Sequence, residues 1–474
     1  LTDGSIKVNC SEKGTVRLIL NGASISSSST APVVVEEAKK VLVTLADGTT
    51  NTITDKTRQS VDDEDFSSAV YSKADLVFNG SGTLNVNAGY RNGIKSTDDL
   101  KVVSGTFNIT SNEDGIIGKD LLGIKDGKFT IKSGSDGMKS TYDTDTSKGN
   151  IVITGGEFDI TASNDGVHCN RDILISGGNL TISSGDDGVH ADANLQVDGG
   201  TIDIKKCYEG LEGVHITLND GDISIVASDD GINAADGSSS SGMGMGGFGG
   251  GQASSSDSSV LLTINGGNIF VNASGDGLDS NGNIVMNGGN VTVLGPTSDG
   301  DTALDFDGTF TINGGVLMAF GSSGMLETPT TAQNGFCIVT TLGAVSANSA
   351  FSLTDSSGNV IMSYIPTKNY ASAIVYSSDI KSGSTYTVTA GSTTQSITVN
   401  SNVTTNGVSG GFGGGQNGGF GGGQRGGQPG GSAPDGNGSF GDGQQGGNQQ
   451  GGMPGGNSGN GRSNSVSSST VNQV

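Results

Sequence analysis

A repeat of about 22 residues runs through residues 81–301 and restricts the folds available to the chain. Each copy opens with a pair such as Gly-Gly, continues as a short alternating segment and ends in an acidic turn, as in GGEFDITASNDGV (155–167) and GGNLTISSGDDGV (177–189). The turn position carries an acid or, in the first copy, Asn: Asn92, Asp114, Asp136, Asp165, Asp187, Glu209, Asp230, Asp276 and Asp299. One unit of this length cannot bury an apolar face alone, so the copies must stack.

Apolar and polar residues alternate within each copy, as at Phe158 and Ile160, and a second apolar run follows in segments such as ILISGG (173–178). Period-two runs bounded by Gly, Asp or Asn predict β-strands, whereas helical repeats need longer periods and heptad-like spacing. We therefore predict an all-β fold, a right-handed parallel β-helix whose coils stack about 4.8 Å apart. Equivalent residues of successive coils then form columns, and the inward apolar columns make the core.

We assign residues 1–325 to this β-helix, with a mobile Gly/Ser-rich insert at 236–259. Residues 326–408 read as a small β-rich cap, which an open solenoid needs to avoid edge-to-edge association. Residues 409–474 are rich in Gly, Gln, Asn and Ser, and we expect a disordered tail because such a composition cannot bury a core.

The chain has 474 residues, 83 of them Gly, no Trp, and a formal net charge of −24. This charge argues against nucleic acid and anionic membrane surfaces as partners and favours cations. No stretch is apolar enough to span a membrane. The first residue is Leu1 rather than Met, which leads us to expect a processed product, extracellular or on the cell surface. Four scattered cysteines do not suggest a disulfide framework, and we expect buried thiols.

Stacking should bring the turn acids into one column, with further acids and Asn164 beside it. Like charges at this spacing repel, so the column must be solvated, protonated or neutralised by cations. Clustered oxygen ligands suit Ca²⁺. We predict that its ligands come from Asp114, Asp136, Asn164, Asp165, Asp186, Asp187, Glu209, Glu212, Asp229, Asp230, Asp276 and Asp279.

Two other interpretations of these turns stay open. In the first, Asp only caps backbone N–H groups and Gly only supplies a positive φ; doubled acids such as Asp186 and Asp187 exceed that need. In the second, His168 and His190 stack on each other between Lys139 and Glu212 and, with carboxylates, hold Zn²⁺.

The segment VRLILNGASISSSSTAPVVVEEAKKVLVTLADGTTNTITD (16–55), followed by the acidic coils, resembles a clostridial carbohydrate-binding β-helix family. The similarity covers roughly residues 1–400, including SLTDSSGNVIMSYIPTKNYASAIVYSSDIKSGSTYTV (352–388). The resemblance implies a pectate-lyase-like fold, bound Ca²⁺, and binding of cellulose and acidic sugars without known catalysis. The family's functional residues map only onto the acidic turns.

We therefore expect a secreted or cell-surface, Ca²⁺-dependent and non-catalytic protein that binds plant cell-wall polysaccharide such as polygalacturonate. Tyr90, Tyr142 and Tyr208 lie at turns and are candidates for stacking on sugar rings, while the absence of Trp argues against crystalline cellulose. A pectate-type lyase with Arg171 as the base is one alternative. A structural surface adhesin that Ca²⁺ only makes rigid is another.

Overall fold

The computed structural model describes residues 1–12, 14–58, 66–142, 144–236 and 259–408, all of which belong to one compact unit. Strands make up the regular structure of these residues, which contain no α-helix. In the same ranges, a helix long and apolar enough to cross a membrane is therefore also absent. The predicted insert at 236–259 and the predicted tail at 409–474 lie outside the described residues, except for the insert's two end residues.

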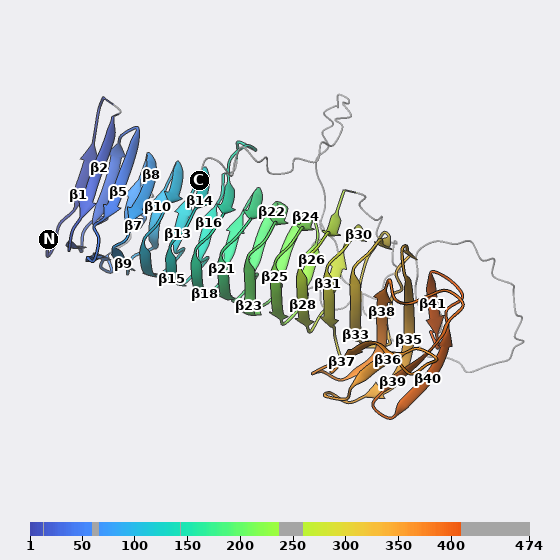
Figure 1. The fold of residues 1–474 in the computed structure, drawn as a ribbon. Coiled ribbons are helices and arrows are strands. Elements are labelled where there is room, and N and C mark those ends of the chain that lie inside the picture. The colour runs from blue at the N-terminus through green and yellow to red at the C-terminus, as the bar shows by residue number, and fades with distance from the viewer. Residues whose placement is uncertain (13, 59–65, 143, 237–258, 409–474) are drawn as a thin grey trace, which may run out of the picture. The chain divides into compact units, whose positions relative to one another are not determined.

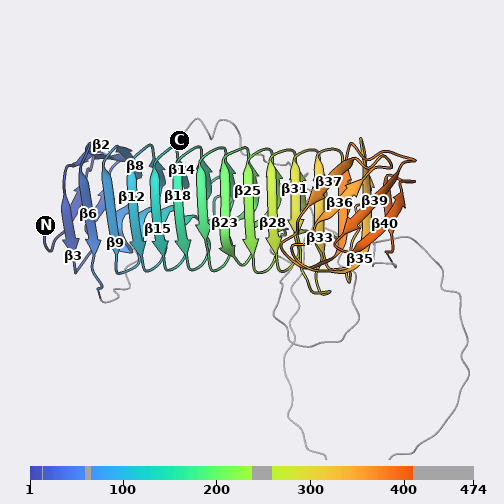
Figure 2. The ribbon, with the colours of Figure 1, turned by 60° about the horizontal axis from the view of Figure 1, so that its bottom comes forward.

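Most strands belong to two large sheets of parallel strands (Figures 1 and 2). The first sheet has 22 strands, arranged in two rows of paired strands. The long strands β22 and β24 pair with members of both rows and so join the rows into one sheet. Its first row is β1 (Ile6–Asn9), β4 (Val33–Glu37), β7 (Ser68–Ser72), β10 (Asn92–Ser96), β13 (Ile116–Gly118), β16 (Met138–Ser140), β19 (Val167–Cys169), β22 (Val189–Val197), β24 (Leu211–Leu218), β26 (Ile232–Ala234) and β29 (Leu278–Ser280).

The second row of this sheet shares β22 and β24 and otherwise contains β2 (Thr15–Leu20), β5 (Lys40–Leu45), β8 (Asp75–Gly80), β11 (Asp99–Val102), β14 (Leu121–Ile124), β17 (Asn150–Ile153), β20 (Asp172–Ile175), β27 (Leu261–Ile264), β30 (Asn283–Met286), β32 (Phe310–Ile312) and β34 (Thr331–Ala332). The parallel part of the second sheet contains β3 (Ser24–Ser27), β6 (Thr50–Asp55), β9 (Thr83–Ala88), β12 (Thr106–Ser111), β15 (Lys128–Ser133), β18 (Glu157–Ala162), β21 (Asn179–Ser183), β23 (Thr201–Cys207), β25 (Asp222–Ala227), β28 (Asn268–Ala273), β31 (Asn290–Leu294) and β33 (Val316–Gly321). Figure 2 shows this row side by side.

The chain visits the rows in turn, so each strand pairs with the equivalent strand one coil later, as a parallel β-helix requires. Phe107 pairs with Phe129, and Phe129 pairs with Phe158. These rings are buried and stack at centroid distances of 5.1 and 4.7 Å. The alternating residues that the sequence assigned to the interior, such as Ile131 and Ile160, are buried in the same core.

Antiparallel strands follow the last parallel coil. β38 (Tyr370–Ser377) pairs on one side with β33 and on the other with β35 (Phe336–Val345), and β41 (Val403–Asn406) extends the sheet beyond β35. A separate four-stranded antiparallel sheet contains β36 (Phe351–Thr354), β37 (Val360–Tyr364), β39 (Thr385–Ala390) and β40 (Thr393–Thr398). The parallel edge of β33 is thereby covered by backbone hydrogen bonding.

Candidate functional site

The turn acids form a continuous row, which we name the acid ladder: Asp114, Asp136, Asp165, Asp187, Glu209, Asp230 and Asp276. Along most of it, the carboxylate of one turn accepts a hydrogen bond from the backbone N–H of the equivalent residue in the next coil. The N–H of Asp165 donates to Oδ1 of Asp136 at 3.2 Å, and that of Asp187 donates to Oδ1 of Asp165 at 3.0 Å. In return, the N–H of each turn glycine donates to the next ladder residue's carbonyl, as Gly166 does to Asp187 at 2.9 Å. The acids therefore tie neighbouring coils together.

The interpretation that the turn glycines supply a positive φ is wrong. Gly166 and Gly188 are not among the residues with positive φ, whereas the leading glycine of the same coils is, as at Gly178 (98°). The turn glycine is required by close approach instead. A Cβ on Gly188 would lie 2.7 Å from the carbonyl oxygen of Gly210 and 2.4 Å from Cδ1 of Ile204.

The last position of the ladder also differs from the expectation. Repeat spacing assigned it to Asp299, but the backbone N–H of Thr302 makes the ladder hydrogen bond, to Oδ1 of Asp276 at 2.5 Å. The carbonyl of Thr302 accepts the corresponding bond from Gly277 at 3.1 Å. Asp299 is exposed, because the turn of this copy is longer than in the others.

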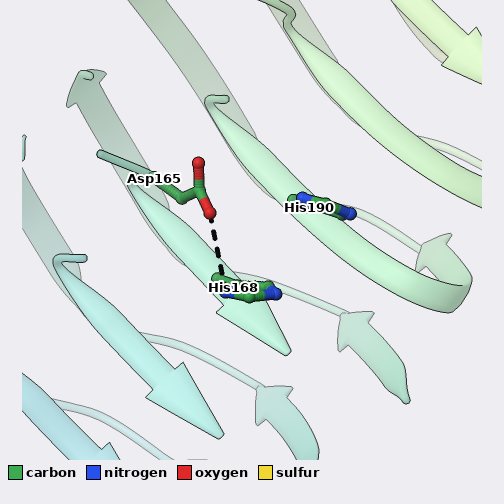
Figure 3. Close-up of side chains that lie close together, drawn as sticks. All are labelled: Asp165, His168 and His190. Atoms are coloured by element: carbon green, nitrogen blue, oxygen red, sulfur yellow. Dashed lines mark ion pairs between the residues drawn. The ribbon is translucent and has the colours of Figure 1, made fainter. Parts of the chain in front are cut away.

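A second column runs beside the acid ladder, three residues further along each coil. Strand pairing aligns its members in the order Lys139, His168, His190, Glu212, Asn233 and Asp279. The predicted stacking of His168 on His190 is confirmed, with ring centroids 4.9 Å apart (Figure 3). The column changes from basic to acidic between His190 and Glu212, and the ladder beside it consequently has two halves.

In the first half, basic side chains neutralise the ladder. Nζ of Lys139 lies 2.5 Å from Asp136 and 3.9 Å from Asp114. Nδ1 of His168 lies 3.5 Å from Asp165, the ion pair drawn in Figure 3, and Nδ1 of His190 lies 3.2 Å from Asp187.

The pKa values of these groups follow from the ion pairs. Burial opposes ionisation of Asp136, yet hydrogen bonds from His168, Lys139 and Asn164 hold its pKa well below the usual range. Burial also opposes the charged form of His168 and so lowers its pKa, but the carboxylates of Asp136 and Asp192 raise that pKa to about 10. His168 is therefore protonated at neutral pH, which works against a Zn²⁺ site at the two histidines.

In the second half, the acids lack basic partners among the described residues. This group, the acid cluster, comprises Glu209, Asp229, Asp230, Asp276 and Asp279, and none of the ion pairs within the described ranges involves them. Carboxylate oxygens of Glu209, Asp229 and Asp230 lie within 4.8 Å of one another. Burial, reinforced by neighbouring carboxylates, raises the pKa of Glu209, Asp230 and Asp276 to about 7 and that of Asp279 well above its usual value. The cluster thus needs protons or a cation.

Two buried oxygen atoms next to the acid cluster make no hydrogen bond within the described structure: Oδ1 of Asn233 and Oγ1 of Thr302. Nδ2 of Asn233 donates to Oε2 of Glu209 at 2.8 Å, which fixes the amide orientation beside the cluster. Buried polar atoms are rarely left without a partner. Neutral and charged oxygens together are the ligand set that Ca²⁺ prefers, so these residues fit that ion. Neither Asn233 nor Thr302 was predicted, although Asn233 follows a ladder acid by three residues, as the other members of the second column do.

The remaining predicted ligands lie in the neutralised half or, in the case of Glu212, at its boundary. Asn164 donates from Nδ2 to Oδ1 of Asp136 at 2.6 Å, and Asp186 is exposed beside Asp165 and Asp187. Oε2 of Glu212 lies 3.3 Å from Nδ1 of His190. The structure therefore brings the predicted acids together in a row, with the basic side chains confined to one end.

The three candidate tyrosines lie in different coils. The guanidinium of Arg58 lies 4.1 Å from the ring centroid of Tyr90. Nζ of Lys119 and Nζ of Lys148 lie 5.2 and 4.8 Å from that of Tyr142. Tyr208 is 44% exposed, and its hydrogen bond with Asp229 raises its pKa to about 12. Only Tyr208 lies beside the acid cluster.

Two further sequence candidates have defined surroundings. Arg171, in the turn between β19 and β20, has a buried Nε atom without a hydrogen-bond partner in the described structure. All four cysteines are free, and Cys169, Cys207 and Cys337 are buried, as expected.

Comparison with known proteins gives three similarities. A family described as carbohydrate-binding domain-containing protein matches residues 1–253. A carbohydrate-binding domain-containing protein of Acetivibrio thermocellus is 34% identical over 110 residues, which cover 23% of this chain and 38% of the relative, well under half of its length. A solved structure, that of the polysaccharide lyase-like protein from C. thermocellum as a gadolinium derivative, is 31% identical over 41% of this chain and 80% of that chain, with a TM-score of 0.41.

Proposed function

The chain belongs to the family of carbohydrate-binding domain-containing proteins, and on this premise we propose that it is a non-catalytic protein that binds acidic polysaccharide through Ca²⁺. The polymer class is plant cell-wall polyuronate such as polygalacturonate. The observation that supports this proposal is the acid cluster, in which half-buried carboxylates lie beside the oxygens of Asn233 and Thr302 that make no hydrogen bond within the described structure.

Glu209, Asp229 and Asp230, whose carboxylate oxygens lie within 4.8 Å of one another, would hold the ion, with Asn233 as a neutral ligand and Asp276 and Asp279 as further ligands from the next coil. Bound Ca²⁺ supplies the positive charge that attracts a sugar carboxylate. Without it, a protein of net charge −24 repels a polyanion, and the half-buried acids of the cluster add to that repulsion when they are ionised. The proposal places the protein outside the cell or on its surface, where such polymers occur. Tyr208, exposed beside the cluster, is the candidate for contact with a sugar ring.

A pectate-type lyase is the second candidate function, because the buried Nε of Arg171 lacks a hydrogen-bond partner in the described structure. Burial raises the pKa of Asp192, but the hydrogen bond from His168 and the charges of His190, His168 and Arg171 hold it below its usual value; Oδ1 of Asp192 lies 3.4 Å from Nε2 of both histidines. In such a reaction Arg171, in its neutral form, would abstract the proton next to the uronate carboxylate; a carbon–carbon double bond would form as the glycosidic C–O bond at the neighbouring carbon breaks, and the leaving oxygen would take up a proton as a hydroxyl group.

Affinity electrophoresis of the full chain through gels that contain polygalacturonate tests both functions. We expect retardation in Ca²⁺, none in EDTA, and none in gels of fully methyl-esterified polymer. Equal mobility in all gels contradicts the proposal and leaves neutral glucans such as cellulose, or an adhesin role, as the alternatives. If the polymer becomes shorter and gains unsaturated ends, and if this cleavage is lost in the Arg171→Ala variant, the protein is a lyase instead.

A further inference from the structure

A row of hydrogen-bonded side-chain amides runs along the turns that precede the strands of the second sheet, whereas the acid ladder follows those strands. Nδ2 of Asn265 donates to Oδ1 of Asn219 at 2.7 Å, and Nδ2 of Asn287 donates to Oδ1 of Asn265 at 2.8 Å. Nδ2 of Asn313 continues the row to Oδ1 of Asn287 at 2.8 Å. The row begins at Asp198, whose carboxylate accepts from Nδ2 of Asn219 at 2.7 Å. We name these five residues the amide ladder.

Three members of the amide ladder are followed directly by glycine, in the pairs Asn265-Gly266, Asn287-Gly288 and Asn313-Gly314. In such a pair the deprotonated backbone nitrogen of the glycine can attack Cγ of the asparagine, because glycine has no Cβ to obstruct it. A bond from this nitrogen to Cγ forms, the bond from Cγ to Nδ2 breaks, and ammonia leaves. Water then opens the resulting succinimide ring to aspartate or isoaspartate. The reaction needs a free glycine N–H and a mobile side-chain amide.

The interior pairs of the ladder have neither. The amide of Asn287 is held on both sides, by its own donor to Asn265 and by the donor of Asn313. The N–H of Gly288 donates to the carbonyl of Ile264 at 3.3 Å. The Asn265 pair is held in the same way, with the N–H of Gly266 donating to the carbonyl of Leu218 at 3.3 Å. Both reacting groups of an interior pair must therefore leave hydrogen bonds before they meet.

Asn313 is the last member, and its surroundings differ. Its Oδ1 accepts no hydrogen bond from the described residues, and the N–H of Gly314 donates none to them. In the next coil Asn334 has a left-handed φ of 57°, and its Nδ2 donates at 2.9 Å to the backbone carbonyl of Asn313 instead of the side chain. The ladder thus ends one coil early, with both reacting groups of its last pair unengaged.

We propose that Asn313 is a site of spontaneous deamidation, with water as its only co-reactant, and that the amide ladder protects Asn265 and Asn287. The inference does not depend on the proposed function. A carboxylate at position 313 cannot donate to Oδ1 of Asn287, so the last ladder bond is lost. The isoaspartate product also lengthens the backbone between β32 and β33, and β33 is the strand on which β38 pairs. Deamidation therefore loosens the junction between the coils and the antiparallel strands.

Peptide mapping by mass spectrometry, after prolonged incubation of the full chain at pH 8, tests the proposal. We expect Asn313 to react about tenfold faster than Asn265 or Asn287, since each interior pair must first break two hydrogen bonds. Asn21-Gly22, in the exposed turn between β2 and β3, is the reference for an unrestrained pair. Equal rates at the three ladder residues overturn the proposal. So does an intact Asn313 after Asn21 has reacted.

Asn313→Ala should transfer the susceptibility, because it makes Asn287 the end of the ladder. Deamidation of Asn287 should then become about fivefold faster. Asn290→Ala is the matched control, since it removes an amide of the same turn that donates to Asn268 at 3.0 Å, outside the amide ladder. Equal rates at Asn287 in the two variants contradict protection by the ladder. Melting temperatures establish that both variants fold, and the rates in the parent chain test Asn313 without any substitution.

Discussion

The backbone N–H of Asp187 donates a hydrogen bond to the carboxylate of Asp165, 3.0 Å away, although the two residues are 22 positions apart in the chain. An aspartate of this ladder therefore caps the next coil rather than its own turn. The acids have a structural role that does not depend on any metal ion, and effects on folding must be separated from effects on binding.

Asp165→Ala should destabilise the protein by about 1–3 kcal/mol, because it leaves the buried N–H of Asp187 without an acceptor. Asp165→Asn keeps an acceptor oxygen and should change stability by less than about 1 kcal/mol. The comparison of the two variants by urea unfolding in EDTA isolates the hydrogen bond from the charge. Equal stabilities would mean that the ladder bond does not matter.

Gly188→Ala should be among the most destabilising single substitutions, costing roughly 2–4 kcal/mol. Its Cβ would lie 2.7 Å from the carbonyl oxygen of Gly210, and a backbone atom cannot move aside without shifting a coil. Gly300→Ala is the control, because nothing lies within 4 Å of a Cβ there and the residue is exposed. Thermal unfolding monitored by circular dichroism measures both. A melting temperature of Gly188→Ala equal to that of the control would contradict the close packing of the turns.

The stability of the protein in EDTA should fall as the pH rises from about 5 to 8. Glu209, Asp230 and Asp276 have pKa values raised to about 7, so they favour the folded state while protonated and lose that contribution as the pH passes through 7. Asp136 acts in the opposite sense. Its lowered pKa stabilises the folded state above about pH 4, and that stabilisation is lost only in stronger acid. We expect the melting temperature to drop by roughly 5 °C or more over this interval.

Added Ca²⁺ should reverse that loss at pH 8 and have little effect at pH 5, where protons occupy the same carboxylates. Differential scanning calorimetry at both pH values, with Ca²⁺ or EDTA, provides the measurement. A melting temperature that rises equally with Ca²⁺ at pH 5 and pH 8 would argue that the ion binds elsewhere.

Asp279→Asn should weaken Ca²⁺ binding tenfold or more, because it removes one charged ligand from the acid cluster. The same change removes the charge whose burial, reinforced by repulsion from neighbouring carboxylates, raises the pKa of Asp279, so the variant in EDTA at pH 8 should be no less stable than the parent. This opposite pair of effects distinguishes a ligand from a residue needed for folding.

Calorimetric Ca²⁺ titration measures the affinity, with Asp159→Asn as the control for loss of one negative charge. Asp159 is exposed on β18, away from the acid ladder. If both variants bind Ca²⁺ equally well, the acid cluster is not the site.

The sequence was sufficient to predict the columns, because the repeat spacing determines which residues share one. Phe107, Phe129 and Phe158 stack as that spacing requires, and so do His168 and His190. It was not sufficient at Thr302, where a longer turn moves the ladder position away from Asp299. A period identifies equivalent positions only while the copies keep one length.

The division of the ladder was not predicted, because it depends on the residue three positions after each turn acid together with side chains from the next coil. Asp136 and Asp230 look alike in the repeat, yet Lys139 and His168 contact only the first. The surroundings of Tyr90 were not predicted for the same reason, because its ring lies against Arg58 of the preceding coil. A turn motif specifies where a side chain starts, and the neighbours on either side determine whether it is paired.

His190 and Glu212 are paired neighbours on β22 and β24, and the second column changes sign between them. A solenoid of identical coils would let a periodic polymer slide from one coil to the next with no change in contacts. This one step removes that equivalence, because a uronate chain of the kind we propose as ligand would exchange basic side chains for carboxylates if it shifted along the ladder. The surface thus has a polarity, and a chain bound along it would have a preferred frame and direction.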